Sequence, residues 1–510
     1  MKRLLPLSLC LLVAAPAFAA PKSKKAEPAP VVVAPAPVAP PVDPEAWRAT
    51  APQPAPARAW APPTATQFTL SNGVPVTFVP NEALPLVSVR LVMGVGREAN
   101  PAGKAGLGAL TANLLDEGTT TRTGAELAAE ATGLGADLSV GAGDELAWVS
   151  VDALARNLGP SLDLLADVAR NPRFDKAEVA RVRNETLASI QAAKAEPRDG
   201  AARAFAAQLF GSAHPYGTPA VGTEGSVSKL RLKDVRDFHA QWWHAGNAGF
   251  VVTGSVSEGA LKDLLEARFG SWKARPAART PVAPASPPMK TRVVFVDQPG
   301  AVQSVLRIGG VGPSRTDAGF MPANVAGTLV GGMFSSRINM NLREEHGWSY
   351  GAFAGFSESR DAGTFAVRTQ VQADKTAPAV VEILKELAAA AGKAPTPEDM
   401  SLTQDYLLKS LPGNFDTNAT TAGSFLAIPQ FGMGPDLWAK YVAEVKAVDA
   451  PAAQAAAQKW FAPERFLIVV AGPRTVEVDD GKGGKQVVDV VKELRALSGK
   501  DGAAFEFVEG

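Results

Sequence analysis

Cysteine is almost absent from this chain, since Cys10 is the single one among 510 residues. It lies in an apolar run at 4–15, which follows a basic pair at 2–3 and precedes a small-x-small pattern at 17–19. This arrangement predicts a signal peptide at 1–20. The run is short for a membrane span, although an uncleaved anchor is the alternative. We expect an exported mature chain with no disulfide, no thiol nucleophile and no stable membrane span, which favours a bacterial periplasm.

Net charge is also absent, and histidines are few. Lys plus Arg and Asp plus Glu both number 51, so the chain has neither the basic footprint of a nucleic-acid binder nor a case for a polybasic membrane surface. It has four histidines, and no Walker-type Gly-Lys-Ser/Thr occurs. Composition therefore argues against nucleic acid as a partner, and the missing Walker motif argues against the commonest nucleotide-binding class.

Proline-rich stretches divide the chain into segments. Residues 21–65 are rich in proline and alanine, a composition that favours polyproline II and predicts a semi-rigid tether. A second such stretch predicts a linker at 274–290. The expected domains are therefore an N-terminal half at 66–273, a C-terminal half at 291–475 and a tail at 476–510.

The two halves resemble each other, which indicates an internal repeat. Each opens with short strands and then a helix, and Asn72-Gly73 is a strong hairpin signal in the first half. Each closes with a helix carrying aromatic residues that leads into a strand, at 249–253 and at 466–471. Long helical patterns occupy 156–169, 175–193 and 378–391. Strands followed by packed helices predict an α+β fold class.

The stretch from Gly331 to Tyr350 has the pattern of a helix that runs into a strand. Gly347 lies where a helix C-cap requires positive φ. Arg343 would close the helix and Tyr350 would open the strand, so two hydrogen-bond donors could converge on one carbonyl oxygen. The alternative is a cation at a helix C-terminus and a half-buried strand aromatic. The residues expected to face the core are Met333, Ile338 and Leu342, and those expected to face solvent are Glu344 and Glu345.

This block closely resembles the arginine/tyrosine motif of insulinase/pitrilysin-type (inverzincin) metallopeptidases, whose two residues lie seven apart, as Arg343 and Tyr350 do. The resemblance covers roughly 66–475 and includes DQPGAVQS from Asp297 and LLKSLPGNF from Leu407. It implies that the pair reaches across a cavity to the zinc site of the other half and helps to hold the substrate backbone and the developing oxyanion.

The same resemblance implies a His-x-x-Glu-His zinc helix, and the matching frame runs from 105 to 119. The zinc-ligand positions read Ala109 and Asn113, and the general-base position reads Ala112. Three leucines keep the helix amphipathic. The sequence therefore keeps the helix but lacks the zinc ligands and the general base, and we expect no metal in this chain.

Glu178 and Glu185 are spaced like the second-shell glutamate and the third zinc ligand of the family. Without histidines, we prefer to interpret both as exposed charges near Arg181 and Arg183. A weak oxygen-donor metal site formed by Glu185 with Asn113 and Asp116 is disfavoured, because no imidazole remains to give zinc its usual affinity.

The histidines lie elsewhere in the chain. His214, in a His-Pro-Tyr-Gly segment that resembles a structural hallmark of the family, is expected to anchor a loop. His239 and His244 are five apart, which is not the spacing of a helical chelate, and predict packing beside two tryptophans. His346 is expected to be a solvated turn residue.

The resemblance thus implies a clamshell of two homologous halves, each of two related α/β sandwich domains. The leading hypothesis is a non-catalytic subunit, inactive alone, of a heterodimeric insulinase-type zinc metallopeptidase. It would pair with a zinc-bearing paralogous subunit and supply Arg343 and Tyr350 in trans to a peptide substrate. The alternative is a non-enzymatic peptide-binding or scaffold protein of the cell envelope with the same fold.

Overall fold

The computed structural model describes residues 45–51, 55, 60–276, 282, 285, 290–462, 465–479, 481–497 and 506–509. The expected signal peptide and most of the expected tether and linker lie outside these residues. The chain separates into two compact units, at 1–59 and at 60–510. In the first unit, the described residues form one 3-10 turn, Ala46–Ala49 (η1), with no buried side chain. The second unit contains both halves of the repeat.

The first half is built on a six-stranded sheet in the order β1-β2-β6-β3-β5-β4. Gly73 has φ +91°, and the predicted Asn-Gly turn joins β1 to β2 there. β2 and β6 are parallel, while the other neighbours are antiparallel. The strands are Thr66–Thr69 (β1), Pro75–Pro80 (β2), Leu86–Met93 (β3), Asp137–Ala142 (β4), Ala147–Leu154 (β5) and Ala248–Gly254 (β6).

Most helices of the first half bury apolar side chains against one face of this sheet, and α5 is the exception. The helices predicted at 156–169 and 175–193 are found as α3 and α4. The helices are Leu107–Ala112 (α1), Gly124–Leu134 (α2), Leu158–Arg170 (α3), Lys176–Ala195 (α4), Pro197–Phe210 (α5), Glu224–Val227 (α6), Leu232–Trp242 (α7) and Glu258–Phe269 (α8). Short 3-10 turns are Arg97–Ala99 (η2), Ala155–Asn157 (η3), Pro215–Gly217 (η4) and Ala245–Asn247 (η5).

The second half repeats the arrangement, with a six-stranded sheet in the order β14-β7-β11-β8-β10-β9. β7, β11, β8, β10 and β9 occupy the places of β2, β6, β3, β5 and β4, and the β7–β11 pair is again parallel. A separate hairpin joins β12 and β13. The strands are Arg292–Asp297 (β7), Gln303–Gly312 (β8), Ser349–Phe356 (β9), Gly363–Gln372 (β10), Leu467–Gly472 (β11), Thr475–Asp479 (β12), Lys485–Asp489 (β13) and Glu506–Glu509 (β14).

The helix predicted at 378–391 in the second half is found as α11. The helices are Phe320–Gly327 (α9), Arg337–Asn339 (α10), Thr376–Gly392 (α11), Pro397–Ser410 (α12), Asn418–Ser424 (α13), Ala427–Phe431 (α14), Leu437–Ala447 (α15), Ala450–Trp460 (α16) and Val490–Leu497 (α17). Two π-helical segments are Thr328–Gly332 (η6) and Met340–Glu345 (η7), and two 3-10 turns are Ala373–Lys375 (η8) and Leu411–Phe415 (η9). In the described part of the chain, no helix combines the length and apolarity needed to cross a membrane.

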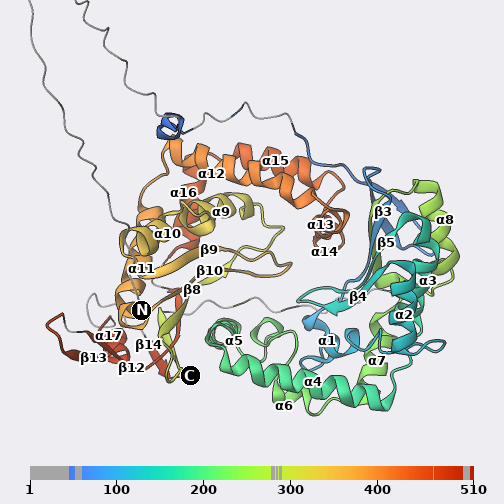
Figure 1. Ribbon diagram of the computed structural model, residues 1–510, viewed down its shortest axis with the longest axis horizontal. Coiled ribbons are helices and arrows are strands. Elements are labelled where there is room, and N and C mark those ends of the chain that lie inside the picture. Colours follow the sequence, from blue (N-terminus) through green and yellow to red (C-terminus); the bar gives the residue numbers. More distant parts are fainter. Residues whose placement is uncertain are drawn as a thin grey trace, which may run out of the picture. The chain divides into compact units, whose positions relative to one another are not determined.

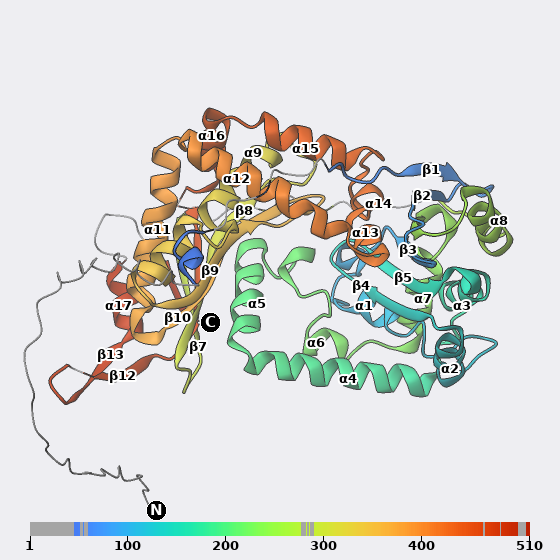
Figure 2. The ribbon, with the colours of Figure 1, turned by 45° about the horizontal axis from the view of Figure 1, so that its top comes forward.

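The two halves exchange helices across their sheets (Figures 1 and 2). Helix α5 of the first half packs on β8 and β11, where Phe205 shares a core with Val305 and Val469. Helices α13 and α14 of the second half supply Phe425 and Ile428 to a core on the first sheet. Each sheet therefore carries its own helices on one face and a helix of the other half on the opposite face.

The α+β class and the two related halves are confirmed by this repeated topology. The division within each half differs from the expectation of two sandwich domains. Each half has one six-stranded sheet. The physical reason is the exchange of helices, because the second face of each sheet is covered by the partner half rather than by a further sheet.

Candidate functional site

Arg343 lies at the end of a helix whose last turn is widened. The helix is regular only over α10 and continues as the π-helical η7, where the sequence pattern predicted a regular helix. Gly347 has φ +65°, and its N–H donates to the Arg343 carbonyl at 3.1 Å. Ile338 and Leu342 are fully buried beneath it. The extra residue in a π turn changes which side chains face the same way, and such turns are frequent at functional sites.

The Arg343 guanidinium lies between two aromatic rings. Its central carbon is 4.7 Å from the ring centroid of Phe334 and 5.2 Å from that of Tyr350. Its Nε is 3.2 Å from Glu344 Oε1. Tyr350 is 88% exposed, so the alternative of a half-buried strand aromatic is wrong. The rings hold the guanidinium by cation–π attraction while its outer N–H groups remain open to a ligand.

Phe334 was missed by the sequence reasoning. It follows the glycines at the end of η6 and is 56% exposed, which is unusual for an aromatic residue beside a core helix. The available signal was a second apolar residue in a row, after Met333, behind the Gly331-Gly332 pair. His346 also differs from the expectation of a solvated turn residue, because it is half-buried and stacks on Trp348 with centroids 4.0 Å apart.

A cavity of about 450 Å³ lies beside this pair. It is lined by Arg343, by residues of β8, β9 and β10, and by residues of the exchanged helix α5. We call it the arginine cavity, because its lining includes Arg198, Arg307, Arg343 and Arg368. Three of these arginines were not singled out from the sequence, since their approach depends on sheet register and on the packing of α5.

Ser349 belongs to a Gly-x-Ser-x-Gly pattern formed by Gly347–Gly351. The pattern lies at a turn that enters strand β9, whereas a nucleophile elbow leaves a strand and enters a helix. The Ser349 side chain is buried and its Oγ lies 2.8 Å from Thr369 Oγ1. The segment therefore positions Tyr350 and supplies no serine nucleophile.

The helix that matches the zinc frame is the short α1, which begins after Gly106 at φ +92°. Ala109 and Ala112 are buried, and Asn113 caps the helix with an exposed side chain. Neither alanine can bind a metal or transfer a proton. The leucines predicted to face the core are buried.

Arg181 binds the glutamates that lie near the α1 helix. Arg181 Nε is 2.7 Å from Glu178 Oε2, and its Nη1 is 2.9 Å from Glu185 Oε1. Its Nη2 pairs with Glu117, which follows α1. These three hydrogen bonds raise the pKa of Arg181. The three glutamate carboxylates therefore share the Arg181 guanidinium as their cation.

Arg183, the other expected neighbour, donates instead to the Leu230 carbonyl at 3.1 Å. Burial raises the pKa of Asp116 to about 6, so this carboxyl loses its proton at a higher pH than an exposed aspartate does. Among the described residues, no cluster of three or more His, Cys, Asp or Glu side chains is arranged to hold a metal. The donor set at α1 and α4 does not fit zinc.

His214 and His239 of the first half each have a hydrogen-bond partner in the backbone. His214 Nδ1 accepts from the Tyr216 N–H at 3.0 Å, which anchors the loop that ends α5. His239 Nε2 lies 3.0 Å from the Ala169 carbonyl and its ring stacks on Trp243. Burial lowers the pKa of His239 to about 4 and also lowers that of His244. Both therefore remain neutral packing residues near pH 7.

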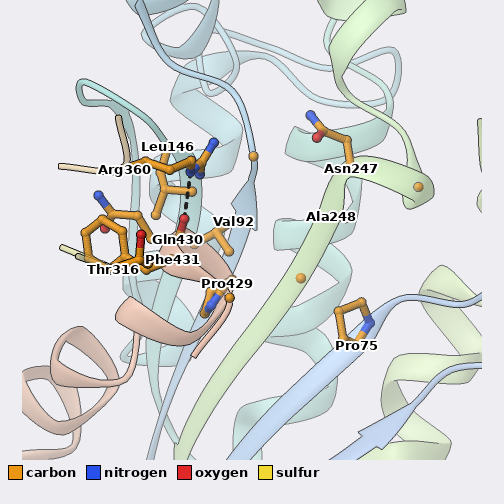
Figure 3. A pocket seen from close by; sticks show the side chains of 14 residues that line it. Pro75, Val92, Leu146, Asn247, Ala248, Thr316, Arg360, Pro429, Gln430 and Phe431 are labelled. Carbon is orange, nitrogen blue, oxygen red and sulfur yellow. Dashed lines mark hydrogen bonds between the residues drawn. The ribbon is translucent and has the colours of Figure 1, made fainter. Parts of the chain in front are cut away.

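A second cavity, of about 610 Å³, has Asn247, Arg360 and Gln430 in its lining (Figure 3). Arg360 donates from Nε to the Gln430 carbonyl at 2.8 Å. Behind it, the buried carboxylate of Glu145 accepts from Tyr216, Ser359, Arg360 and Gln430. These four donors come from both halves and hold the carboxylate in place, so Glu145 links the halves.

Comparisons with known proteins agree with this geometry. A family model described as insulinase (peptidase family M16) matches residues 77–223, and one described as the peptidase M16 inactive domain matches residues 229–407. An uncharacterized zinc protease of Mycobacterium tuberculosis is 30% identical over 319 residues, which is 61% of this chain and 70% of that relative. One of Mycobacterium leprae is 27% identical over 346 residues, covering 66% and 76%.

Solved structures share the fold. A peptidase M16 inactive domain from Pseudomonas fluorescens superposes with a TM-score of 0.75 at 23% identity, over 80% of this chain and 98% of that chain. A protease from Helicobacter pylori gives a TM-score of 0.76 at 19% identity, over 81% and 100%.

Proposed function

The chain belongs to the insulinase family, peptidase family M16, and from that membership we propose that it is a non-catalytic peptidase subunit. In this proposal it pairs with a zinc-bearing paralogous subunit, and the two enclose a chamber for peptide substrates. Zinc belongs to the partner. This chain contributes Arg343 and Tyr350 in trans.

One observation carries the proposal: the metal position is replaced while the donor pair is kept. Ala109 and Ala112 provide no ligand and no base, and Arg181 binds the carboxylates nearby. Arg343 and Tyr350 nevertheless lie together at the wall of the arginine cavity. A scaffold without peptide ligands would have no need for two exposed donors held side by side.

The donor pair suits a developing oxyanion. Phe334 and Tyr350 flank the guanidinium, so little side-chain freedom is lost when a substrate carbonyl accepts from it. The Tyr350 hydroxyl, on an exposed ring, supplies a second donor. Donors positioned in advance stabilise the charge of a tetrahedral intermediate more than that of a neutral carbonyl.

We also propose that the chain is exported. Residues 1–20 would be the signal peptide, and a periplasmic location would suit a mature chain free of cysteine. The proline-rich stretch at 21–65 would then be a tether ahead of the peptidase-like halves.

Hydrolysis of a quenched peptide library tests the proposal. The mature chain is assayed alone, mixed with a zinc-motif paralogue from the same genome, and with a chelator. Activity that requires the mixture and is abolished by the chelator is the expected result. Chelator-sensitive activity of the chain alone would overturn it. If no mixture hydrolyses peptide but the chain still binds it, the scaffold alternative would be favoured. The arginine cavity, which also has aromatic residues in its lining, is the feature that supports that alternative.

A further inference from the structure

The arginine cavity has an unbalanced charge. Four arginines line it, and no aspartate or glutamate does. The chain as a whole has no net charge, so this concentration is local. A cavity wall with one sign of charge attracts ligands of the opposite sign.

Two of the arginines face each other across neighbouring strands. Arg307 on β8 is the direct register partner of Arg368 on β10. Like charges placed directly opposite in an antiparallel pair repel each other, which is unfavourable unless an anion lies between them. Throughout the described ranges, neither residue has an ion-pair partner. The pair therefore lacks a counter-charge from the protein.

Arg307 is the more enclosed of the two. Its guanidinium carbon is 5.2 Å from the ring centroid of Phe205, on the exchanged helix α5. Its Nε is buried and has no hydrogen-bond partner in the described part of the protein. Burial and the neighbouring Arg368 lower the pKa of Arg307. An enclosed cation with an unused donor is a site at which an anion gains both charge pairing and a hydrogen bond.

The other arginines extend the site at both ends. Arg198 on α5 donates to the Gln370 side chain, which keeps its guanidinium at the cavity. Arg343 lies at the opposite end with Tyr350. Ala201, Val305 and Phe353 add apolar surface to the same wall. This mixture of guanidinium groups and apolar side chains suits a carboxylate carried on a peptide better than a fully hydrated inorganic anion.

We propose that the arginine cavity binds a peptide carboxylate and selects acidic peptides. The inference rests on the proposed function in one respect, namely that the ligand entering beside Arg343 and Tyr350 is a peptide. The carboxylate can come from an acidic side chain or from the peptide C-terminus, and the same guanidinium groups would recognise either.

Fluorescence anisotropy with labelled peptides and the mature chain alone separates these sources. One peptide carries glutamates and an amidated C-terminus, a second replaces the glutamates by glutamines, and a third is the glutamine peptide with a free C-terminus. Inorganic phosphate is a competitor. We expect the glutamate peptide to bind at least about tenfold more tightly than the amidated glutamine peptide. Tight binding of the third peptide would support the cavity with the C-terminus as source.

Substitutions localise the binding. Arg368→Gln and Arg198→Gln should each weaken binding of the glutamate peptide about tenfold, because each removes a charge-assisted contact. Arg156→Gln is the matched control, since Arg156 is exposed and lies outside the cavity. Melting temperatures show that the variants fold, and Arg368→Glu should weaken binding of the glutamate peptide more than Arg368→Gln does. Equal binding of charged and amidated neutral peptides, or complete displacement by phosphate at the peptide's own concentration, would overturn the inference.

These outcomes are distinct from those of the proposed function. Charge-selective binding by this chain, with inactive mixtures, would leave the cavity assignment standing and reject the peptidase subunit. Active mixtures without charge-selective binding would support the peptidase subunit and reject the cavity assignment.

Discussion

The Arg343 guanidinium stacks over the Tyr350 ring, with its central carbon 5.2 Å from the ring centroid. A strand residue thus fixes the orientation of a residue at a helix end. The two donors consequently share one position in space although they come from different elements.

Replacing Arg343 tests the role of this pair. Arg343→Ala should lower turnover of the active mixture by about 10² to 10³, because a donor to the developing oxyanion is lost. Arg343→Lys should recover only part of the activity, since an ammonium lacks the planar fork. Assembly with the partner, followed by size-exclusion chromatography, should not change. Wild-type turnover in Arg343→Ala would rule out the assigned role.

Arg181 provides a prediction about the replaced metal position. Arg181→Gln leaves three carboxylates without their shared cation and should reduce the free energy of unfolding by about 1 kcal/mol at low salt. High salt should shrink the difference, because the pairs are partly exposed. Urea unfolding at two salt concentrations measures both values. Arg183→Gln, on the same helix, is the control and should show little salt dependence.

Metal content gives a direct check on the donor set at α1. The purified chain should contain far less than one zinc per molecule, because Ala109 and Ala112 supply no donor atom. A chelator should leave its melting temperature unchanged. Stoichiometric zinc by elemental analysis, lost together with stability on chelation, would show that other residues form a metal site.

His239 predicts a pH dependence of stability. Its pKa in the folded state is about 4, below the ordinary value of 6.5, so the unfolded chain binds the proton more readily. Its contribution is therefore complete above pH 6.5 and is lost as the pH falls from 6.5 to 4, by about 2 to 3 kcal/mol. His239→Gln, which keeps a donor for the Ala169 carbonyl, should remove this part of the profile in urea unfolding.

Asp116 acts in the opposite direction over part of the same range. Its raised pKa of about 6 favours the protonated form in the folded state, so its contribution improves as the pH falls through 6. Only the difference between wild type and His239→Gln isolates the histidine. Parallel profiles for the two proteins would contradict the prediction.

Glu145 should be important for stability rather than for turnover chemistry. Glu145→Ala would leave buried donors from both halves without an acceptor and should cost at least about 3 kcal/mol in unfolding free energy. Asp144→Asn is the control at the adjacent position, because the Asp144 side chain is 61% exposed and pairs with Arg97 instead of joining the buried network. Equal melting temperatures for the two variants would show that the buried network contributes little.

The sequence predicted the turns and helices that are determined by residues close together in the chain. The Asn-Gly turn before β2 and the long amphipathic helices α3, α4 and α11 were found close to their expected bounds. The position of Arg343 before Tyr350 also followed from helix and turn patterns. The roles of these two residues in catalysis remain predictions.

Features that depend on distant contacts could not be read from the sequence. The π turn at η7 has no recognised sequence pattern. Arg307 and Arg368 are 61 residues apart in the chain and lie opposite each other only because of the register between β8 and β10. Helix α5 has little amphipathic contrast, because alanines occupy much of it, so its packing on the other half's sheet was not predicted. Arg181 was noticed only as a neighbour of Glu178 and Glu185 on its own helix, and its contact with Glu117 depends on the packing of α1 against α4.

The exchange of helices also constrains the order in which the chain can mature during synthesis. The face of the first sheet around Val79 and Val251 receives its cover from Phe425 and Ile428, which leave the ribosome long after that sheet is complete. Until then, the nascent first half carries an uncovered apolar surface, which is the kind of surface that chaperones bind. The first half therefore stays vulnerable to aggregation until the second half folds onto it.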